Sequence, residues 1–411
     1  MHQPSRNPCL SKSQQTRFLE LCQEAGFDLY GFTLASISQE DRENLDRFAR
    51  ENASNDLHWF NQHVHLRTHP SDILPGAISV LMLGAIYRHP EMDEALANSR
   101  AKVSRYAAGK DYHLVLRKKA ARLADRFFEL HRKELPGLRY RVTTDSAPVP
   151  EKILARNAGL GWQGKNTNLI HPEMGSYFFL TGVFLNADLE GFAEDLLRHP
   201  STFPSHSNSQ GLPDLRSASP ENFGDPRKSS GDRYAANSNG GETARSAEQE
   251  GLFGSEVPEI PTDSESGAQY AEPSLFRAPN VDRCGSCRQC LDACPTGALE
   301  PYRIEASKCI SYWTIEAKSA MPETVAANIQ SWIFGCDICQ EVCPYNRGAK
   351  GRRQVTKEES FEPRSFLMQW MASPTDPGES NTWSKLSVSS PLKRPGQDRF
   401  RESWKVIDAR S

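Results

Sequence analysis

The chain has 411 residues and is close to electroneutral, with 49 lysine and arginine residues against 52 aspartate and glutamate residues. This length predicts two or three domains. No stretch approaches the roughly 18 consecutive apolar residues of a membrane span, and the first 30 residues lack the apolar core of a signal peptide. We therefore expect a cytoplasmic protein without membrane contact, in which clustered cysteines indicate a metal or redox site rather than disulfides.

The N-terminal half alternates apolar strands with amphipathic helices. Hydrophobic periodicity and capping residues predict helices over 12–25, 36–53 and 111–135, and strands over 27–35, 78–87 and 138–144. A loop, a helix, a glycine-rich loop and further strands follow. Residues 1–195 are therefore expected to form an α/β or α+β catalytic domain.

Asp145 ends the last of these predicted strands and begins the turn "DSAP". Loops at strand ends are where such domains present catalytic groups. A carboxyl group in a dry pocket would hold a raised pKa and act as a proton donor. The alternative is a purely structural N-cap for the helix that begins near Val149.

Two motifs nearby resemble cofactor signatures but depart from them. "GLGWQGKN", residues 159–166, differs from a phosphate-binding P-loop because Asn166 replaces the hydroxyl residue and a helix precedes the loop. "DYHLVL" begins like the D-x-H-x-x-G motif of some cobalamin proteins, but Leu116 stands where glycine is required. We therefore interpret His113 as a polar residue at the start of a helix.

Residues 196–280 have a different composition from the rest of the chain. They are rich in Ser, Gly, Pro, Asn and Glu, and residues 201–280 hold twelve acidic and six basic residues. Such a segment buries too little apolar surface to offset its ordering entropy, so we expect a disordered insert. A long flexible insertion costs little closure entropy.

Eight of the ten cysteines lie within 60 residues of one another. "CGSCRQCLDACPTGAL" has the C-x2-C-x2-C-x3-C-P spacing of bacterial ferredoxins, and "CDICQEVCPYN" adds a second run that again ends in Cys-Pro. Cys309 lies between the two runs. Zinc is the alternative, because paired C-x-x-C units also bind zinc. Residues 281–350 are thus predicted to be a ferredoxin-like module with two [4Fe–4S] clusters.

In the ferredoxin pattern the last cysteine of a run binds the other cluster. The expected ligands of cluster 1 are Cys284, Cys287, Cys290 and Cys343. The expected ligands of cluster 2 are Cys294, Cys309, Cys336 and Cys339.

Several stretches together resemble the epoxyqueuosine reductases, which depend on cobalamin and iron–sulfur clusters. They include "HLRTHPSDILPGAISVLMLG", "RYAAGKDYHLVLRKK", "TTDSAPVPEKILARNAGLGWQGKNTNLI", "EMGSYFFLTGVFL" and both cysteine runs. The resemblance implies that the clusters feed electrons to a base-off cobalamin, and that epoxyqueuosine at the wobble position of tRNA is reduced to queuosine, the last step of queuosine biosynthesis. It also implies a monomer served by an electron donor of the ferredoxin or flavodoxin type.

The resemblance assigns individual residues as well. Asp145 matches the proton donor and a cobalamin contact. Further cobalamin contacts match Arg67, Ser104, Asn166, Leu169, Leu180, Ser311, Asp337 and Ile338. For Leu169, Leu180 and Ile338, ordinary core packing is an equal alternative.

Residues 351–411 form a C-terminal segment that would contact tRNA. "SPLKRPGQDRFRESW" resembles a family segment that precedes a final helix, but "KVIDARS" is expected to end the chain without that helix. Lys393, Arg394, Arg399 and Arg401 would contact phosphate or belong to a solvated tail.

Two other functions are compatible with the cysteines. A reductive dehalogenase-like corrinoid reductase would share both cofactors but act on small molecules, and it would usually carry a twin-arginine signal. A ferredoxin-like electron carrier would need neither Asp145 nor a corrinoid.

Overall fold

Four antiparallel strands form the central sheet of the N-terminal half, in the order β2-β3-β8-β5. Their bounds are β2 Leu29–Leu34, β3 Ser79–Ile86, β8 Phe178–Leu185 and β5 Tyr140–Thr143. β3 is buried at every position, as expected for an apolar central strand. Since every neighbouring pair is antiparallel, this half is α+β rather than α/β.

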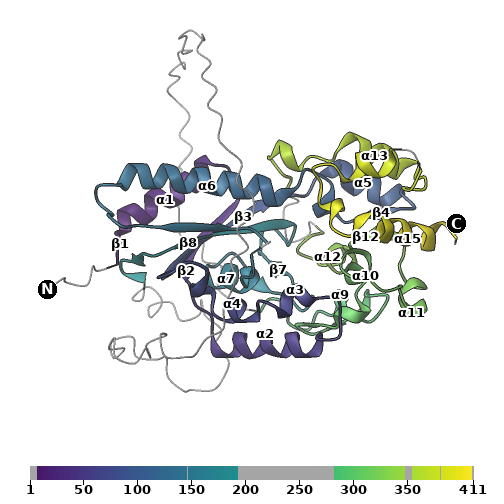
Figure 1. Cartoon of the computed structure of the whole chain (residues 1–411), viewed down its shortest axis with the longest axis horizontal. Helices are drawn as coiled ribbons and strands as arrows, with labels where there is room; N and C mark the ends of the chain where they lie inside the picture. The colour runs from purple at the N-terminus through teal and green to yellow at the C-terminus, as the bar shows by residue number, and fades with distance from the viewer. Residues whose placement is uncertain (1–6, 146, 193–281, 348–353, 380, 410–411) are drawn as a thin grey trace, which may run out of the picture. The chain divides into compact units, whose positions relative to one another are not determined.

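Helices cover both faces of this sheet (Figure 1). On one face lie α1 (Lys12–Glu24) and α6 (Tyr112–His131), with the ring of Phe18 stacked on Phe127 at 4.0 Å. α1 begins where the sequence predicts, because Ser11 and Gln14 form a capping box. On the other face, α7 (Glu151–Asn157) packs Leu154 into a second apolar core.

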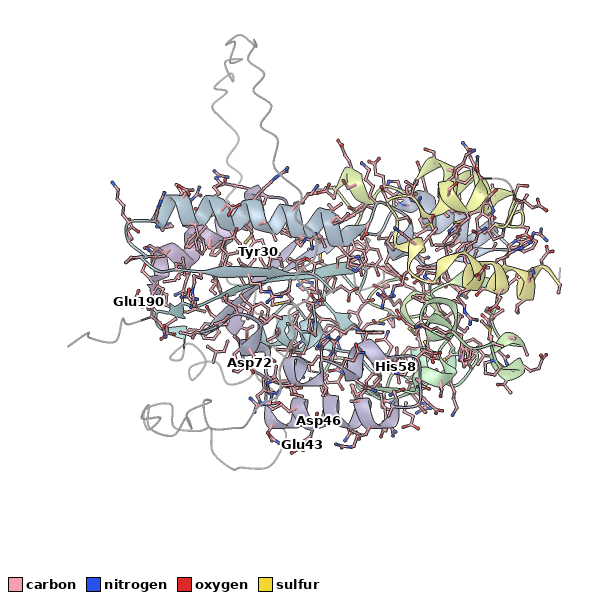
Figure 2. The ribbon with its side chains drawn as sticks, in the orientation of Figure 1. Tyr30, Glu43, Asp46, His58, Asp72 and Glu190 are labelled. Atoms are coloured by element: carbon pink, nitrogen blue, oxygen red, sulfur yellow. The ribbon has the colours of Figure 1, made fainter. Side chains whose placement is uncertain are left out.

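Shorter elements complete the N-terminal half. Glu43 and Asp46 mark the outer side of α2, and His58 begins α3 (Figure 2). The bounds of these elements are β1 Cys9–Leu10, α2 Gln39–Glu51, α3 His58–Asn61, α4 Val64–Thr68, α5 Pro90–Asn98, β4 Lys102–Val103, β6 Trp162–Gln163, β7 Leu169–Ile170 and β9 Asp188–Leu189.

The computed structural model describes residues 7–145, 147–192, 282–347, 354–379 and 381–409, and the predicted insert 196–280 lies outside them. The described residues all belong to one compact unit. None of the helices in these ranges is long and apolar enough to cross a membrane.

The cysteine-rich segment is built from short elements between its cysteines. Their bounds are α9 Gln289–Asp292, β10 Leu299–Glu300, β11 Arg303–Ile304, α10 Ile310–Ile315, α11 Glu323–Ala326, β12 Trp332–Phe334 and α12 Ile338–Glu341. β12 pairs in parallel with β4 of the N-terminal half. One apolar core, containing Val103, Trp332 and Phe334, spans both segments.

The C-terminal segment does not end as the sequence suggested. It forms α13 (Ser365–Ala372), α14 (Thr382–Ser387) and a 13-residue final helix, α15 (Gly396–Asp408), which includes most of "KVIDARS". The expectation of a chain end without a helix was therefore wrong. The physical reason is the spacing of Phe400, Ser403 and Ile407, which places all three on one buried face.

The sequence singled out four basic residues of this segment, Lys393, Arg394, Arg399 and Arg401. Three of these four make contacts within the protein. Arg394 pairs with Glu316, Arg401 pairs with Asp376, and the buried Arg399 donates to the Ser319 carbonyl. The segment is thus packed rather than a solvated tail.

Candidate functional site

Asp145 lies just beyond β5 with its backbone in the left-handed region, at a φ of 45°. The Tyr112 hydroxyl donates a hydrogen bond to its carboxylate, and His113 Nε2 lies 3.3 Å from the same oxygen. The Asp145 backbone N–H donates to Glu151 Oε1 at 2.7 Å. A strained backbone held by three polar partners is typical of a functional position.

His113 lies between two carboxylates. Its Nδ1 is 2.7 Å from Asp111, the N-cap of α6, and its Nε2 faces Asp145. Burial lowers the pKa of His113, but hydrogen bonds to Asp145 and Asp111 outweigh burial and raise it above the ordinary value. The sequence interpretation placed His113 correctly at a helix start but missed its contact with Asp145.

The protonation of this group differs from the sequence prediction. Partial desolvation raises the pKa of Asp145, whose side chain is 58% exposed, yet hydrogen bonds from His113 and Tyr112 outweigh it, so the pKa is lowered and the predicted raised pKa was wrong. Burial, and then the charge of Asp145, raise the pKa of Glu151 well above its ordinary value. Asp145 therefore favours the ionised form, whereas Glu151 favours the protonated form and His113 the charged form.

A cavity of about 240 Å³ lies between the N-terminal half and the cysteine-rich segment. Its wall includes all four predicted ligands of cluster 2. Five of the eight further residues predicted to contact cobalamin also line it. They are Ser104, Asn166, Ser311, Asp337 and Ile338. The cavity is also lined by Lys152, Thr167 and Asn168, which no motif in the sequence marked. Lys152 directly follows Glu151 in the chain, so the cavity lies next to the acidic group around Asp145.

The other three predicted contacts lie outside the wall of this cavity. Leu169 belongs to the apolar core beneath the sheet and Leu180 packs against it, as the core-packing alternative expects. Arg67 is buried over the rings of Trp59 and Phe60, at 5.0 and 4.5 Å. Its Nε has no hydrogen-bond partner among the described residues, which leaves a donor for a ligand.

Asp337 holds the two sides of the cavity together. This carboxylate, between two predicted cluster ligands, is 1% exposed and accepts hydrogen bonds from Ser104 Oγ, from the Arg105 backbone N–H at 2.9 Å and from Arg105 Nη1 at 3.0 Å. Arg105 also reaches Glu341 and Asp93, each at 2.7 Å. The position of cluster 2 relative to the cavity therefore depends on Arg105.

All ten cysteines are free thiols. Burial raises the pKa of Cys343 to about 11, and the charges of Cys284, Cys290 and Cys287 add to this. Burial likewise raises the pKa of Cys339, with further contributions that include Cys309 and Cys294. The cysteines named as raising each pKa belong to the same predicted ligand set as the thiol they affect. The exception is Cys290, a predicted ligand of cluster 1, which also raises the pKa of Cys339.

Within the described ranges no three His, Cys, Asp or Glu side chains converge closely enough to hold one metal ion. The spacing of the eight clustered cysteines is that of a module for two [4Fe–4S] clusters.

Comparison with known proteins supports this assignment. A family described as "4Fe-4S double cluster binding domain" matches residues 283–346, and one described as "Epoxyqueuosine reductase QueG, DUF1730" matches residues 67–146. The epoxyqueuosine reductase of Leadbetterella byssophila is 32% identical over 84% of this chain and 82% of its own length. That of Xanthomonas campestris pv. campestris is 31% identical over 93% of this chain and 83% of its own length.

Solved structures share the fold. A crystal structure of epoxyqueuosine reductase with an epoxyqueuosine-modified tRNA-Tyr stem loop superposes with a TM-score of 0.63 at 23% identity, covering 97% of this chain and 81% of that chain. The enzyme from Streptococcus thermophilus gives a TM-score of 0.60 at 21% identity, covering 96% of this chain and 80% of that chain.

Fold and site define an oxidoreductase with an α+β domain joined to a module for two [4Fe–4S] clusters. The chain belongs to the epoxyqueuosine reductase family.

Proposed function

We propose that this protein reduces epoxyqueuosine in tRNA to queuosine, with Asp145 as the proton donor. One observation carries the proposal. The carboxylate of Asp145 has Tyr112, His113 and Glu151 around it, and Lys152, the residue after Glu151, lines a cavity whose wall also holds the predicted ligands of cluster 2. A site that brings a proton source next to an electron source suits a reductive removal of oxygen.

The side chains that line the cavity suit one part of a base-off cobalamin, and the rest of that group would extend beyond a cavity of about 240 Å³. The cavity presents hydroxyl and amide side chains, from Ser104, Asn166 and Ser311, that suit the amide groups around a corrin ring. The unpartnered Nε of Arg67 adds a donor nearby. When bound, the clusters and the cobalamin would supply low-potential electrons for opening the epoxide.

The chemistry requires two electrons and two protons for each epoxide, whose oxygen leaves as water. Asp145 begins ionised, so it must first take a proton, and His113 and Glu151 are the two neighbours that can hold one. A substrate that excludes water from this group would favour the neutral form of Asp145. Asp145 would then donate its proton to the leaving oxygen, and His113 or Glu151 would protonate the Asp145 carboxylate again.

The partners follow from the same proposal. The substrate would be tRNA that carries epoxyqueuosine, as in the stem-loop complex of the related enzyme. Electrons would come from a donor of the ferredoxin or flavodoxin type, and the protein would act as a cytoplasmic monomer.

An anaerobic turnover assay tests the proposal. The full chain is reconstituted with iron, sulfide and cobalamin, supplied with epoxyqueuosine-containing tRNA and a strong reductant, and queuosine is quantified by mass spectrometry. Asp145→Asn should lose about 10²–10⁴-fold in kcat, the contribution typical of a general acid. Asp72→Asn, at an exposed carboxylate that pairs with His65, should retain activity.

Three results would contradict the proposal or a part of it. A cofactor-loaded protein that leaves epoxyqueuosine unchanged would refute the substrate, and small organohalides would be tested next. Full activity of Asp145→Asn would refute the role of Asp145 alone. Absence of a bound corrinoid spectrum after reconstitution would favour a simple electron carrier.

A further inference from the structure

The glycine-rich loop, residues 159–168, touches both cysteine-rich segments. Lys165 Nζ donates to the carbonyls of Gly285 and Cys287, the latter at 3.1 Å. Asn166 Nδ2 donates to the Cys339 carbonyl at 3.1 Å. The loop that resembles a P-loop in sequence therefore uses its lysine to bind the backbone around the predicted ligands of cluster 1.

Trp162 is the part of this loop that lies beside the cluster 1 thiols. Its side chain is 1% exposed and shares a small apolar core with Ile170 and Cys343. Tyr345 packs against its ring at 4.7 Å between centroids, and the Arg283 guanidinium lies 5.8 Å from the ring centre. Trp162 is thus enclosed by residues adjacent to two of the predicted ligands, Cys284 and Cys343.

The indole N–H of Trp162 has no hydrogen-bond partner within the part of the chain that the structure describes. A buried donor without an acceptor is uncommon in folded proteins. Its ring packs with Cys343, a predicted ligand of cluster 1, so a sulfur of that cluster is the acceptor that the geometry offers.

A cluster-bound cysteine is a thiolate, and its sulfur accepts hydrogen bonds. Hydrogen bonds to such sulfurs belong to the factors that set the reduction potential of an iron–sulfur cluster. A donor stabilises the reduced cluster, which carries one more negative charge, more than the oxidised cluster. A donor directed at one ligand of one cluster would therefore shift that cluster alone.

We propose that Trp162 is a positioning residue for cluster 1, whose N–H donates to a sulfur of that cluster and makes the reduction potential of the cluster less negative. The step affected is the uptake of one electron by the oxidised cluster from a low-potential reductant, with no proton or bond change. The inference requires the two clusters but not the proposed reaction on tRNA, so the two can fail independently.

The test is a potentiometric titration of the reconstituted full chain, with dithionite as the reductant and electron paramagnetic resonance as the readout. Trp162→Phe keeps an aromatic ring and removes the N–H. At a fixed potential, the ratio of reduced to oxidised cluster 1 should fall about fivefold, the effect of losing one ordinary hydrogen bond. Cluster 2 and the iron and sulfide content should remain unchanged.

Trp370→Phe is the matched control. Trp370 is also buried, at 5% exposure, but its N–H donates to the Thr375 carbonyl at 3.1 Å. An unchanged potential of cluster 1 in Trp162→Phe, or an equal shift in Trp370→Phe, would overturn the proposal.

A second measurement avoids any dependence on how well Trp162→Phe assembles its clusters. Fluorinated tryptophan, incorporated throughout the wild-type chain, keeps the side-chain shape and makes the indole N–H a stronger donor. The potential of cluster 1 should then become less negative, and it should not do so in labelled Trp162→Phe. A labelled wild-type protein with an unchanged cluster 1 potential would contradict the role of the N–H.

Discussion

Arg105→Met tests whether the Arg105–Asp337 ion pair holds the cysteine-rich segment on the N-terminal half. The Arg105 and Asp337 side chains are 9% and 1% exposed, and Nη1 lies 3.0 Å from Oδ2. Methionine keeps most of the apolar length of the arginine stem and removes the guanidinium. The change therefore leaves a buried carboxylate without its cation.

The expected magnitude follows from the remaining contacts of Asp337. Removing one partner of a buried pair costs about 3–5 kcal/mol. Asp337 would keep the hydrogen bonds from Ser104 Oγ and from the backbone N–H of residue 105. We therefore expect the lower end, about 3 kcal/mol of unfolding free energy. Arg401→Met is the control, because its pair with Asp376 is 41% and 13% exposed and should contribute about 0.2–1 kcal/mol.

Anaerobic urea unfolding, followed by tryptophan fluorescence, measures both variants. A double-mutant cycle with Asp337→Asn separates the pair from other effects of the substitution, since the cost of Arg105→Met should be smaller by about 1–3 kcal/mol when residue 337 carries no charge. Equal costs for Arg105→Met and Arg401→Met would refute the reasoning. So would a cost of Arg105→Met that is independent of residue 337.

Three further predictions concern separate parts of the chain. His113→Gln should remove the alkaline limb of the pH profile of kcat/KM. The pKa of His113 is raised, so the imidazole holds its proton below that pKa and loses it as the pH rises through it. An unchanged alkaline limb would mean that another group causes the limb. Gly335→Ala should lower the stability measured in thermal melts by about 2 kcal/mol, because φ is +66° and the new Cβ would lie 2.6 Å from Ser104 Cβ. Gly137→Ala is the control: its φ is +80° but the new Cβ would meet open space, so it should cost less in the same melts. Phe18→Ala should cost about 3–5 kcal/mol in urea unfolding by emptying a site that is fully buried, and a cost below 1 kcal/mol would mean that the core collapses around it.

The secondary structure of the N-terminal half could be predicted because its signals are local. The helix expected over 12–25 is observed at Lys12–Glu24, and the strand expected over 78–87 at Ser79–Ile86. A capping residue and an apolar period lie within a few residues of the element they define. The final helix α15 was missed because it follows a proline and begins with a glycine, and this pair usually marks a break in structure.

The cluster module could also be predicted from the sequence. Cysteine spacings of two and three residues place several thiolates around one cluster regardless of the surrounding fold. The same holds for Asp145, whose place at a strand end is visible in the sequence and is confirmed by its position after β5.

The surroundings of these residues are a property of the tertiary structure. The pairing of β4 with β12 joins segments more than 200 residues apart through strands of two and three residues, which are too short to leave a periodic pattern. The contact of His113 with Asp145, the ion pair of Arg105 with Asp337, and the packing of Trp162 with Cys343 likewise depend on tertiary packing. By itself the sequence predicted which groups would carry the chemistry, because ligand spacing and strand ends are local. Only the folded chain decided which charges and donors surround them, and therefore that the pKa of Asp145 is lowered rather than raised.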